Sequence, residues 1–257
     1  MLEKNQLLFY FLVRSRNSYE YLEPCIFSIL QQKYVNYKII FIDDDSDYTT
    51  TQRNRIKQLL SEHYVIFNRL RKFSLRNAHE AIHNIITQRE SIVVSLDGDD
   101  WLVNENVLSY LNKVYQKTGC WLTYGSCLFW DGEKTSTNPI DKAFMTANQE
   151  YPAATIRNRN YRKILFLPLH LRTWKTWLFL KIKKEDFLDS HGEWLRFCED
   201  QAMYYPMMEM AGKHMKVISK HLSVYNNANS ESDVKTNFFE QMRDEIQIRK
   251  KTQYEEI

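Results

Sequence analysis

Apolar residues recur along the first half of the chain in two alternating patterns. Uninterrupted apolar runs are typical of strands buried on both faces, whereas apolar residues three or four positions apart are typical of helices covering a core. The runs predict strands at residues 7–13, 37–42, 64–67 and 91–96. The spaced stripes predict helices at residues 19–32, 49–62, 77–87 and 105–115. This alternation predicts an α/β, Rossmann-like fold with a mostly parallel central sheet flanked by helices on both faces.

The pattern loosens after about residue 120. Further strands are predicted at residues 121–130 and 216–225, and further helices at 171–182, 200–211 and 230–251. We therefore predict one domain over residues 1–225, divided into a half at 1–120 and a smaller half at 121–225. An amphipathic helix within residues 226–257 follows this domain.

Two segments of the second half have alternative interpretations. Residues 131–163 are polar and end in a basic cluster, which would either hold an anionic ligand or remain a solvated loop. The last helix has an apolar stripe at Phe239, Met242 and Ile246. We expect this stripe to dock on its own domain, with a partner surface as the alternative.

Composition restricts the class of protein. The chain has 257 residues, is 44% hydrophobic and has a formal net charge of +3. The near balance of charge argues against a nucleic-acid partner, which would require a clustered basic excess. No apolar run approaches the roughly 20 residues of a transmembrane helix, and the N-terminus lacks a signal-peptide pattern. Four cysteines without paired spacing predict reduced thiols, so we expect a cytoplasmic protein.

Glycine is scarce, with only six residues in the chain. None of them has the spacing of a GxGxxG or GxxxxGKS/T loop. Those loops need glycine because their backbone N–H groups must approach phosphate closely. A phosphorylated ligand would therefore have to be bound by other chemistry.

Aspartate runs at residues 43–47 and 97–100 directly follow two of the predicted strands. The carboxyl ends of parallel strands meet at one edge of a sheet, which is where ligands bind in open α/β folds. So many carboxylates would repel one another unless a cation or hydrogen-bond donors were present. Asp97 and Asp99, separated by Gly98 on a tight turn, can offer oxygens to one hard divalent ion. Such an ion would bind phosphate indirectly.

An ordered set of short motifs resembles a known family. The set consists of Arg14-Ser15-Arg16-Asn17, Phe27-Ser28-Ile29-Leu30-Gln31-Gln32, Asp43-Asp44-Asp45-Ser46, Leu75-Arg76-Asn77-Ala78, Asp97-Gly98-Asp99-Asp100 and Glu199-Asp200-Gln201-Ala202. In order and separation they resemble the family 2 glycosyltransferases of the GT-A fold, over about residues 5–225. The resemblance implies a nucleotide-sugar-binding half at 1–120 and an acceptor-side half at 121–225.

The resemblance also implies residue roles. Nucleotide-sugar contacts are implied for Ser15, Asn17, Asp43, Asp44, Arg76, Asn77, Asp97 and Gly98. Mn²⁺ or Mg²⁺ is implied as cofactor, bound by Asp97 and Asp99. Asp45 stands where the family usually has glycine, and Arg14 stands where it usually has proline.

The acceptor side is implied by two further stretches. Asp200 resembles the general base, with Glu199 beside it, although the same position suits an ordinary helix cap. The stretch around His170 and Arg172 resembles a His-Leu-Arg-Thr block and would lie near the diphosphate or the acceptor. A structural, hydrogen-bonded histidine is an equal alternative for His170.

A rival motif has the form H-E-x-x-H, at His79, Glu80 and His83. In a metalloprotease the two histidines bind zinc and the glutamate acts as base, but a third protein ligand is required. No such ligand is evident downstream, because the chain turns directly into the next predicted strand.

The sequence thus predicts a metal-dependent, inverting glycosyltransferase. It would move a sugar from a nucleoside-diphosphate donor, with UDP as the family default, to a hydroxyl of a glycan, lipid-linked or protein acceptor in glycan synthesis. The alternatives are the zinc metalloprotease and a non-catalytic nucleotide-sugar-binding scaffold.

Overall fold

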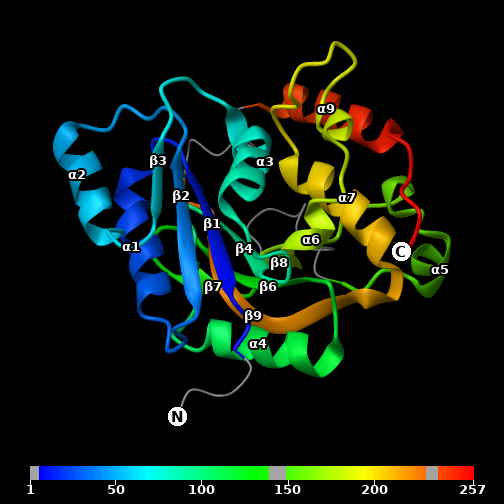
Figure 1. Cartoon of the computed structure of the whole chain (residues 1–257), viewed down its shortest axis with the longest axis horizontal. Coiled ribbons are helices and arrows are strands. Elements are labelled where there is room, and N and C mark those ends of the chain that lie inside the picture. Colours follow the sequence, from blue (N-terminus) through cyan, green and yellow to red (C-terminus); the bar gives the residue numbers. More distant parts are fainter. Residues whose placement is uncertain (1–5, 139–148, 230–236) are drawn as a thin grey trace.

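The computed structural model describes residues 6–138, 149–229 and 237–257 (Figure 1). Parts of the predicted polar segment and of the predicted last helix lie outside these residues. The strands of the described part are β1 Phe9–Ser15, β2 Tyr37–Asp43, β3 Tyr64–Phe67, β4 Ile92–Asp97, β5 Trp101–Leu102, β6 Leu122–Trp130, β7 Thr135–Ser136, β8 Arg172–Lys175 and β9 Met215–Asn226. The α-helices are α1 Tyr19–Leu30, α2 Thr50–Leu59, α3 Phe73–Ile85, α4 Val107–Thr118, α5 Ala153–Asn158, α6 Thr176–Phe179, α7 Glu199–Ala211 and α9 Phe238–Lys250.

The strands of the described residues form one nine-stranded sheet in the order β3-β2-β1-β4-β8-β6-β9-β5, with β7 paired to β6. Strands β1 to β4 pair in parallel, as the strand–helix alternation predicts. Strand β8 then joins antiparallel between β4 and β6. The α/β class and the mostly parallel first half of the sheet are therefore confirmed, and the second half adds antiparallel pairs.

Side chains of β1 alternate between two apolar cores. Phe9, Phe11 and Val13 pack in a core with residues of α1 and α4, whereas Tyr10 and Leu12 pack in a second core with residues of α3 and α7. Figure 1 shows these helices around the sheet. Because helices cover both faces, the strand is apolar at every position from Phe9 to Val13 rather than at alternate ones.

One predicted helix is wrong. Residues 171–182 form strand β8 followed by the four-residue helix α6. The hydroxyl of Thr173 lies 2.7 Å from both the Tyr115 and the Thr123 hydroxyl oxygens, and Trp174 is fully buried. Cross-strand partners such as these are distant in sequence, and a short apolar run does not by itself distinguish a strand from a helix.

The C-terminal helix does not dock through its apolar stripe. Phe239, Met242 and Ile246 are exposed, and α9 is held by buried Ile248 and Asp244 instead. One carboxylate oxygen of Asp244 accepts hydrogen bonds of 3.0 Å from the backbone N–H groups of Arg196 and Phe197. A polar anchor of this kind leaves no apolar signature in the sequence.

The basic cluster at the end of the polar segment is largely structural. Arg162 is buried and forms a two-point ion pair with Glu209 on α7, with N–O distances of 2.6 and 2.8 Å. Arg159 donates to the Tyr254 carbonyl, so the C-terminal segment lies beside α5, as Figure 1 shows. These two arginines fix the chain and are not available to hold an acceptor.

Candidate active site

Three parallel strands bring their last residues to one edge of the sheet. In the strand register Arg14 of β1 lies opposite Asp97 of β4, and Ser15 lies opposite Asp43 of β2. The predicted edge therefore exists, and the two aspartate runs leave it on either side of β1. This is the carboxyl-end position at which open α/β sheets bind ligands.

Arg14 connects the strand ends to α7. Its Nη2 atom lies 3.0 Å from Asp97 Oδ1 and 2.9 Å from Ser95 Oγ, and its Nη1 lies 3.5 Å from Glu199 Oε1. Burial, the largest single influence, favours the protonated form of Asp97. The Arg14 guanidinium, together with His170 and Arg172, outweighs burial and holds the pKa of this carboxyl below its usual value. Asp97 is therefore ionised at neutral pH.

Asp97, Asp100 and His170 could hold a metal ion. Each offers one ligand atom, and these atoms all lie within 4.8 Å of one another. The Oδ2 of Asp100 is buried with no hydrogen-bond partner, and burial next to Asp99 and Asp97 raises the pKa of Asp100 well above its usual value. Burial lowers the pKa of His170 to about 3, so the imidazole is in the neutral, ligating form. An unsatisfied buried carboxylate oxygen facing a neutral imidazole fits a bound cation.

Asp99 is placed differently from its predicted role. Its Oδ2 accepts a 2.7 Å hydrogen bond from Asn229, and Asp99 is not a member of the three-residue group. Burial raises its pKa to about 6. The geometry thus gathers Asp97 with Asp100 and His170 rather than with Asp99. The sequence alone did not single out Asp100 as a candidate ligand, because adjacent aspartates in one run look alike in sequence.

The start of α7 carries the predicted acceptor-side acids. Asp200 Oδ2 lies 3.0 Å from Arg172 Nη2, so the His-Leu-Arg-Thr block and the Glu-Asp pair meet. Burial is the main reason that the pKa of Glu199 rises to about 7, although Arg14 opposes the shift. Both carboxylates are only partly exposed, with about a fifth of each side chain accessible.

Asp44 organises the predicted nucleobase end. Its carboxylate accepts hydrogen bonds of 2.8 Å from the backbone N–H groups of Lys72 and Phe73 and one of 3.0 Å from Asn68. The same Asn68 amide donates to Asn77 Oδ1 at 2.8 Å. Asp44 and Asn77 are therefore brought together. Asp44 also binds the backbone where α3 begins, a role that its motif does not reveal.

The remaining predicted contacts lie on two neighbouring turns. Ser15 Oγ lies 2.8 Å from Ser18 Oγ, and the Asn17 side chain accepts from the backbone of Asp47. Asp43 is fully buried, and burial raises its pKa. A Cβ atom added to Gly98 would lie 2.7 Å from Ser15 Cβ, so the chain passes this point only as glycine. Thus Gly98 allows a close approach of the β1 and β4 ends.

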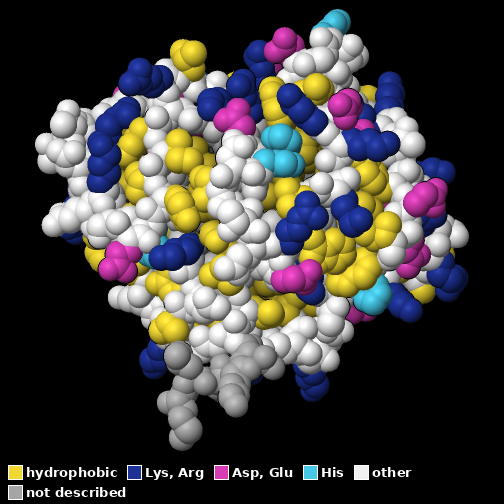
Figure 2. Space-filling model, in the orientation of Figure 1, with side chains coloured by type: hydrophobic (Ala, Val, Ile, Leu, Met, Phe, Trp, Pro, Cys, Tyr) yellow, Lys and Arg dark blue, Asp and Glu magenta, His cyan; other side chains and the backbone are white. Residues whose placement is uncertain are grey.

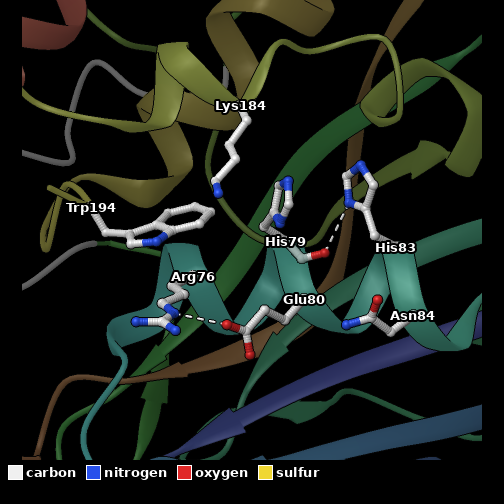
Figure 3. A pocket seen from close by; sticks show the side chains of 7 residues that line it. All are labelled: Arg76, His79, Glu80, His83, Asn84, Lys184 and Trp194. Carbon is white, nitrogen blue, oxygen red and sulfur yellow. Dashed lines mark hydrogen bonds and ion pairs between the residues drawn. The ribbon is translucent and has the colours of Figure 1, made fainter. Parts of the chain in front are cut away.

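Arg76 and the rival H-E-x-x-H motif lie on the outer part of α3. Arg76 Nε donates to Glu80 Oε1 at 2.8 Å instead of reaching the aspartates. The rings of His79 and His83 stack with centroids 4.0 Å apart, and Figure 3 shows Glu80 pointing away from them. Among the described residues no third acidic, histidine or cysteine ligand joins this pair, since the one candidate group is at Asp97, Asp100 and His170. A catalytic zinc site is not assembled here.

The sequence matches the family described as Glycosyl transferase family 2 over residues 11–183. The chain belongs to this family, and the fold expected from the six motifs is confirmed. No curated protein matches the chain in sequence.

Solved structures of glycosyltransferases share the fold at low identity. TarS of S. aureus in complex with UDP-GlcNAc is 16% identical with a TM-score of 0.63, over 92% of this chain and 65% of that one. The mannosyltransferase PcManGT of Pyrobaculum calidifontis, in complex with GDP-Man and Mn²⁺, is 14% identical with a TM-score of 0.57, over 98% and 67%. The TarS 1-349 structure is covered to 60% of its length, so this chain spans about three fifths of that protein fragment.

No helix of the described residues is both long and apolar enough to cross a membrane. On the face shown in Figure 2, lysine and arginine side chains are spread among acidic and apolar ones rather than gathered in one basic stripe.

Proposed function

We propose that this protein is a metal-dependent, inverting glycosyltransferase that moves a sugar from a nucleoside-diphosphate donor, UDP in the first instance, to an acceptor hydroxyl. The observation that carries the proposal is that Arg14, at the carboxyl ends of parallel strands, pairs with both Asp97 and Glu199. Next to Glu199, the proposed base Asp200 pairs with Arg172. Family membership supports sugar transfer. The fold neighbours with bound UDP-GlcNAc and GDP-Man support a nucleotide-sugar donor.

Asp97 is a proposed metal ligand in both candidate ligand sets. The family pattern adds Asp99, whereas the geometry adds Asp100 and His170. An imidazole in the set favours Mn²⁺ over the harder Mg²⁺. A bound divalent ion would neutralise charge on the departing diphosphate. Arg14 and Arg172, both buried, would provide further positive charge beside it.

Asp200 is the proposed general base. It lies in the first turn of α7, and its Oδ2 contacts Arg172. A single carboxylate that accepts the acceptor's hydroxyl proton is enough for an inverting displacement. Glu199 is the neighbouring alternative, because a pKa of about 7 suits proton transfer near neutral pH.

The acceptor is proposed to be a glycan, a lipid-linked sugar or a protein side chain, in glycan synthesis. We also propose a cytoplasmic location, because all four cysteines are free and burial raises the pKa of each thiol.

The test is thermal unfolding with a panel of nucleoside diphosphates and nucleotide-sugars, with and without Mn²⁺. One donor class should raise the melting temperature only when Mn²⁺ is present, and Asp97→Asn should abolish that rise. The control Asp131→Asn, on an exposed turn, should retain it. An equal rise in melting temperature when a donor is added without Mn²⁺ would refute the metal-dependent donor site. An undiminished Mn²⁺-dependent rise in the Asp97→Asn variant would also refute it.

Transfer is tested separately from binding. Asp200→Asn should bind the donor normally and lower kcat by about 10² to 10⁴-fold. Glu199→Gln should have the smaller effect, and the reverse ranking would move the base to Glu199. Donor binding without transfer to any of the three acceptor classes would favour the scaffold alternative.

A further inference from the structure

A pocket of about 160 Å³ opens on the outer side of α3 (Figure 3). One wall is α3, and the other comes from the segment that carries Lys184 and Trp194. That second segment runs on to Glu199 and Asp200 at the start of α7. The pocket is distinct from the carboxylate cluster, because none of its lining residues belongs to that cluster.

The single acid of this pocket is already neutralised. Glu80 Oε2 lies 2.7 Å from Lys72 Nζ, and Glu80 Oε1 lies 2.8 Å from Arg76 Nε. These two cations lower the pKa of Glu80 despite its partial burial. In Figure 3 its carboxylate points away from the pocket's imidazoles. Glu80 therefore does not balance the charge of Lys184.

The Lys184 ammonium reaches the pocket without a hydrogen-bond acceptor among the described residues. Lys184 Nζ lies 5.7 Å from the centre of the Trp194 ring and points toward the gap between Trp194 and His79 (Figure 3). His79 packs edge-on against Trp194 and stacks on His83, whose Nδ1 is 2.9 Å from the His79 carbonyl oxygen. Asn84 completes this wall.

The surroundings of His79 are electropositive. Partial burial, together with His83 and Lys184, lowers the pKa of His79 to about 4, and Glu80 opposes this shift only weakly. His79 is thus neutral at pH 7 and presents one ring N–H beside a lysine ammonium. A metal ion between His79 and His83 is disfavoured because Lys184 would repel it. An oxyanion gains charge-assisted hydrogen bonds at the same place.

We propose that this pocket binds an oxyanion, a phosphate or a carboxylate, carried by an acidic acceptor sugar. The acceptor assignment rests on the proposed function, since the donor diphosphate is there assigned to the Asp97 edge. The acceptor assignment is also based on the position of Lys184 and Trp194 in the acceptor-side half. The segment that carries them leads along the chain to the proposed base, Asp200. Lys184 supplies the charge, and His79 with Asn84 supplies directional donors.

The experiment follows the His79 imidazole by NMR while glucose 6-phosphate, glucuronate or glucose is added to the full chain. An anionic sugar should shift the His79 signals saturably and raise the His79 pKa by roughly 1, because a nearby negative charge favours the imidazolium. Lys184→Gln should weaken binding at least about tenfold, the loss expected for a charge-assisted hydrogen bond. Lys181→Gln makes the same change of charge in the same segment outside the pocket and should bind normally.

Each outcome decides the proposal. A response to only one of the two anions supports it and identifies the acceptor as phosphorylated or as a sugar acid. No response to either anion, an equal response to glucose, or a stronger response to Zn²⁺ overturns it. Mn²⁺-dependent donor binding, measured on the same samples, separates the two proposals. Intact donor binding without an anion response defeats only the acceptor pocket. An anion response without donor binding defeats the proposed function and with it the acceptor assignment, and leaves the pocket as an oxyanion site.

Discussion

Arg14 and Asp97 face each other across neighbouring parallel strands, and their side chains form an ion pair of 3.0 Å. The same guanidinium lies 3.5 Å from Glu199 on α7. A single buried cation therefore joins the end of β4 to the start of α7. The family motif has proline at this position, so the motif gave no reason to expect this ion pair.

Replacement of Arg14 should destabilise the protein and make it more dependent on a cation. Arg14→Gln removes a buried cation from two partly exposed carboxylates, which retain Arg172 as a more distant positive charge. The loss of unfolding free energy should therefore lie above the roughly 1 kcal/mol of an exposed pair and below the about 3–5 kcal/mol of a fully buried one. Mn²⁺ should then raise the melting temperature of this variant more than that of the parent protein. Calorimetric melting with and without Mn²⁺ measures both effects.

The control is Arg16→Gln, which removes an exposed arginine two residues further along the chain. It should change the unfolding free energy by no more than about 0.5 kcal/mol. Equal destabilisation by the two variants would mean that the ion pair contributes nothing.

Replacement of the proposed metal ligands should distinguish the two ligand sets. Asp100→Asn and His170→Gln should each weaken Mn²⁺ binding at least about tenfold, because both side chains belong to the group with atoms within 4.8 Å. Asp99→Asn should have a much smaller effect, since its carboxylate is bound by Asn229. Mn²⁺ titration by calorimetry or electron paramagnetic resonance measures the affinities. A large loss with Asp99→Asn alone would restore the Asp97–Asp99 pair.

Much of the fold could be predicted because its signals are local. The buried parallel strands are mostly apolar, and the helices between them have apolar residues on one side, so periodicity locates both. Periodicity does not locate the strand at Arg172–Lys175, because its partners on β4 and β6 are roughly 50 to 80 residues away in sequence. The α9 helix was predicted, but its docking face was not, because it is anchored by Ile248 and the charged Asp244 instead of its apolar stripe.

The sequence could predict which residues belong to the candidate site, but not which of them form ion pairs with one another. The strand-end aspartates could be recognised because the carboxyl ends of parallel strands share one edge of a sheet. The Glu199–Asp200 pair could be recognised only from the resemblance to the family. Which carboxylate meets which cation depends on side-chain direction across the sheet. Arg76 is the clearest example, because its own helix offers Glu80 one turn away and the ion pair forms there.

The loss of stability caused by a substitution at Gly98 should depend on the side chain at Ser15, because the two positions are in close contact. Gly98→Ala would place a Cβ 2.7 Å from Ser15 Cβ and 3.1 Å from the Arg14 carbonyl oxygen, which predicts a loss of about 1–3 kcal/mol of stability. Ser15→Gly removes the nearer atom, so the double variant should be more stable than the sum of the single losses predicts. Urea unfolding of the four proteins in this cycle measures the coupling. Additive losses would show that the strand ends separate freely.

Protonation of His79 should lower stability on the acid side of neutrality. Its pKa is about 4 in the folded protein against an ordinary value of 6.5, so folding favours the neutral ring. The contribution of the neutral His79 ring to the free energy of unfolding is therefore fully present above about pH 6.5 and is lost as the pH falls toward 4. His79→Gln should lose less unfolding free energy between pH 7.5 and pH 5 than the parent protein does, as measured by urea unfolding at both pH values. His191→Gln, an exposed histidine on a loop, is the control and should follow the parent. If His79→Gln also follows the parent, the ring does not experience the electropositive pocket formed with His83 and Lys184.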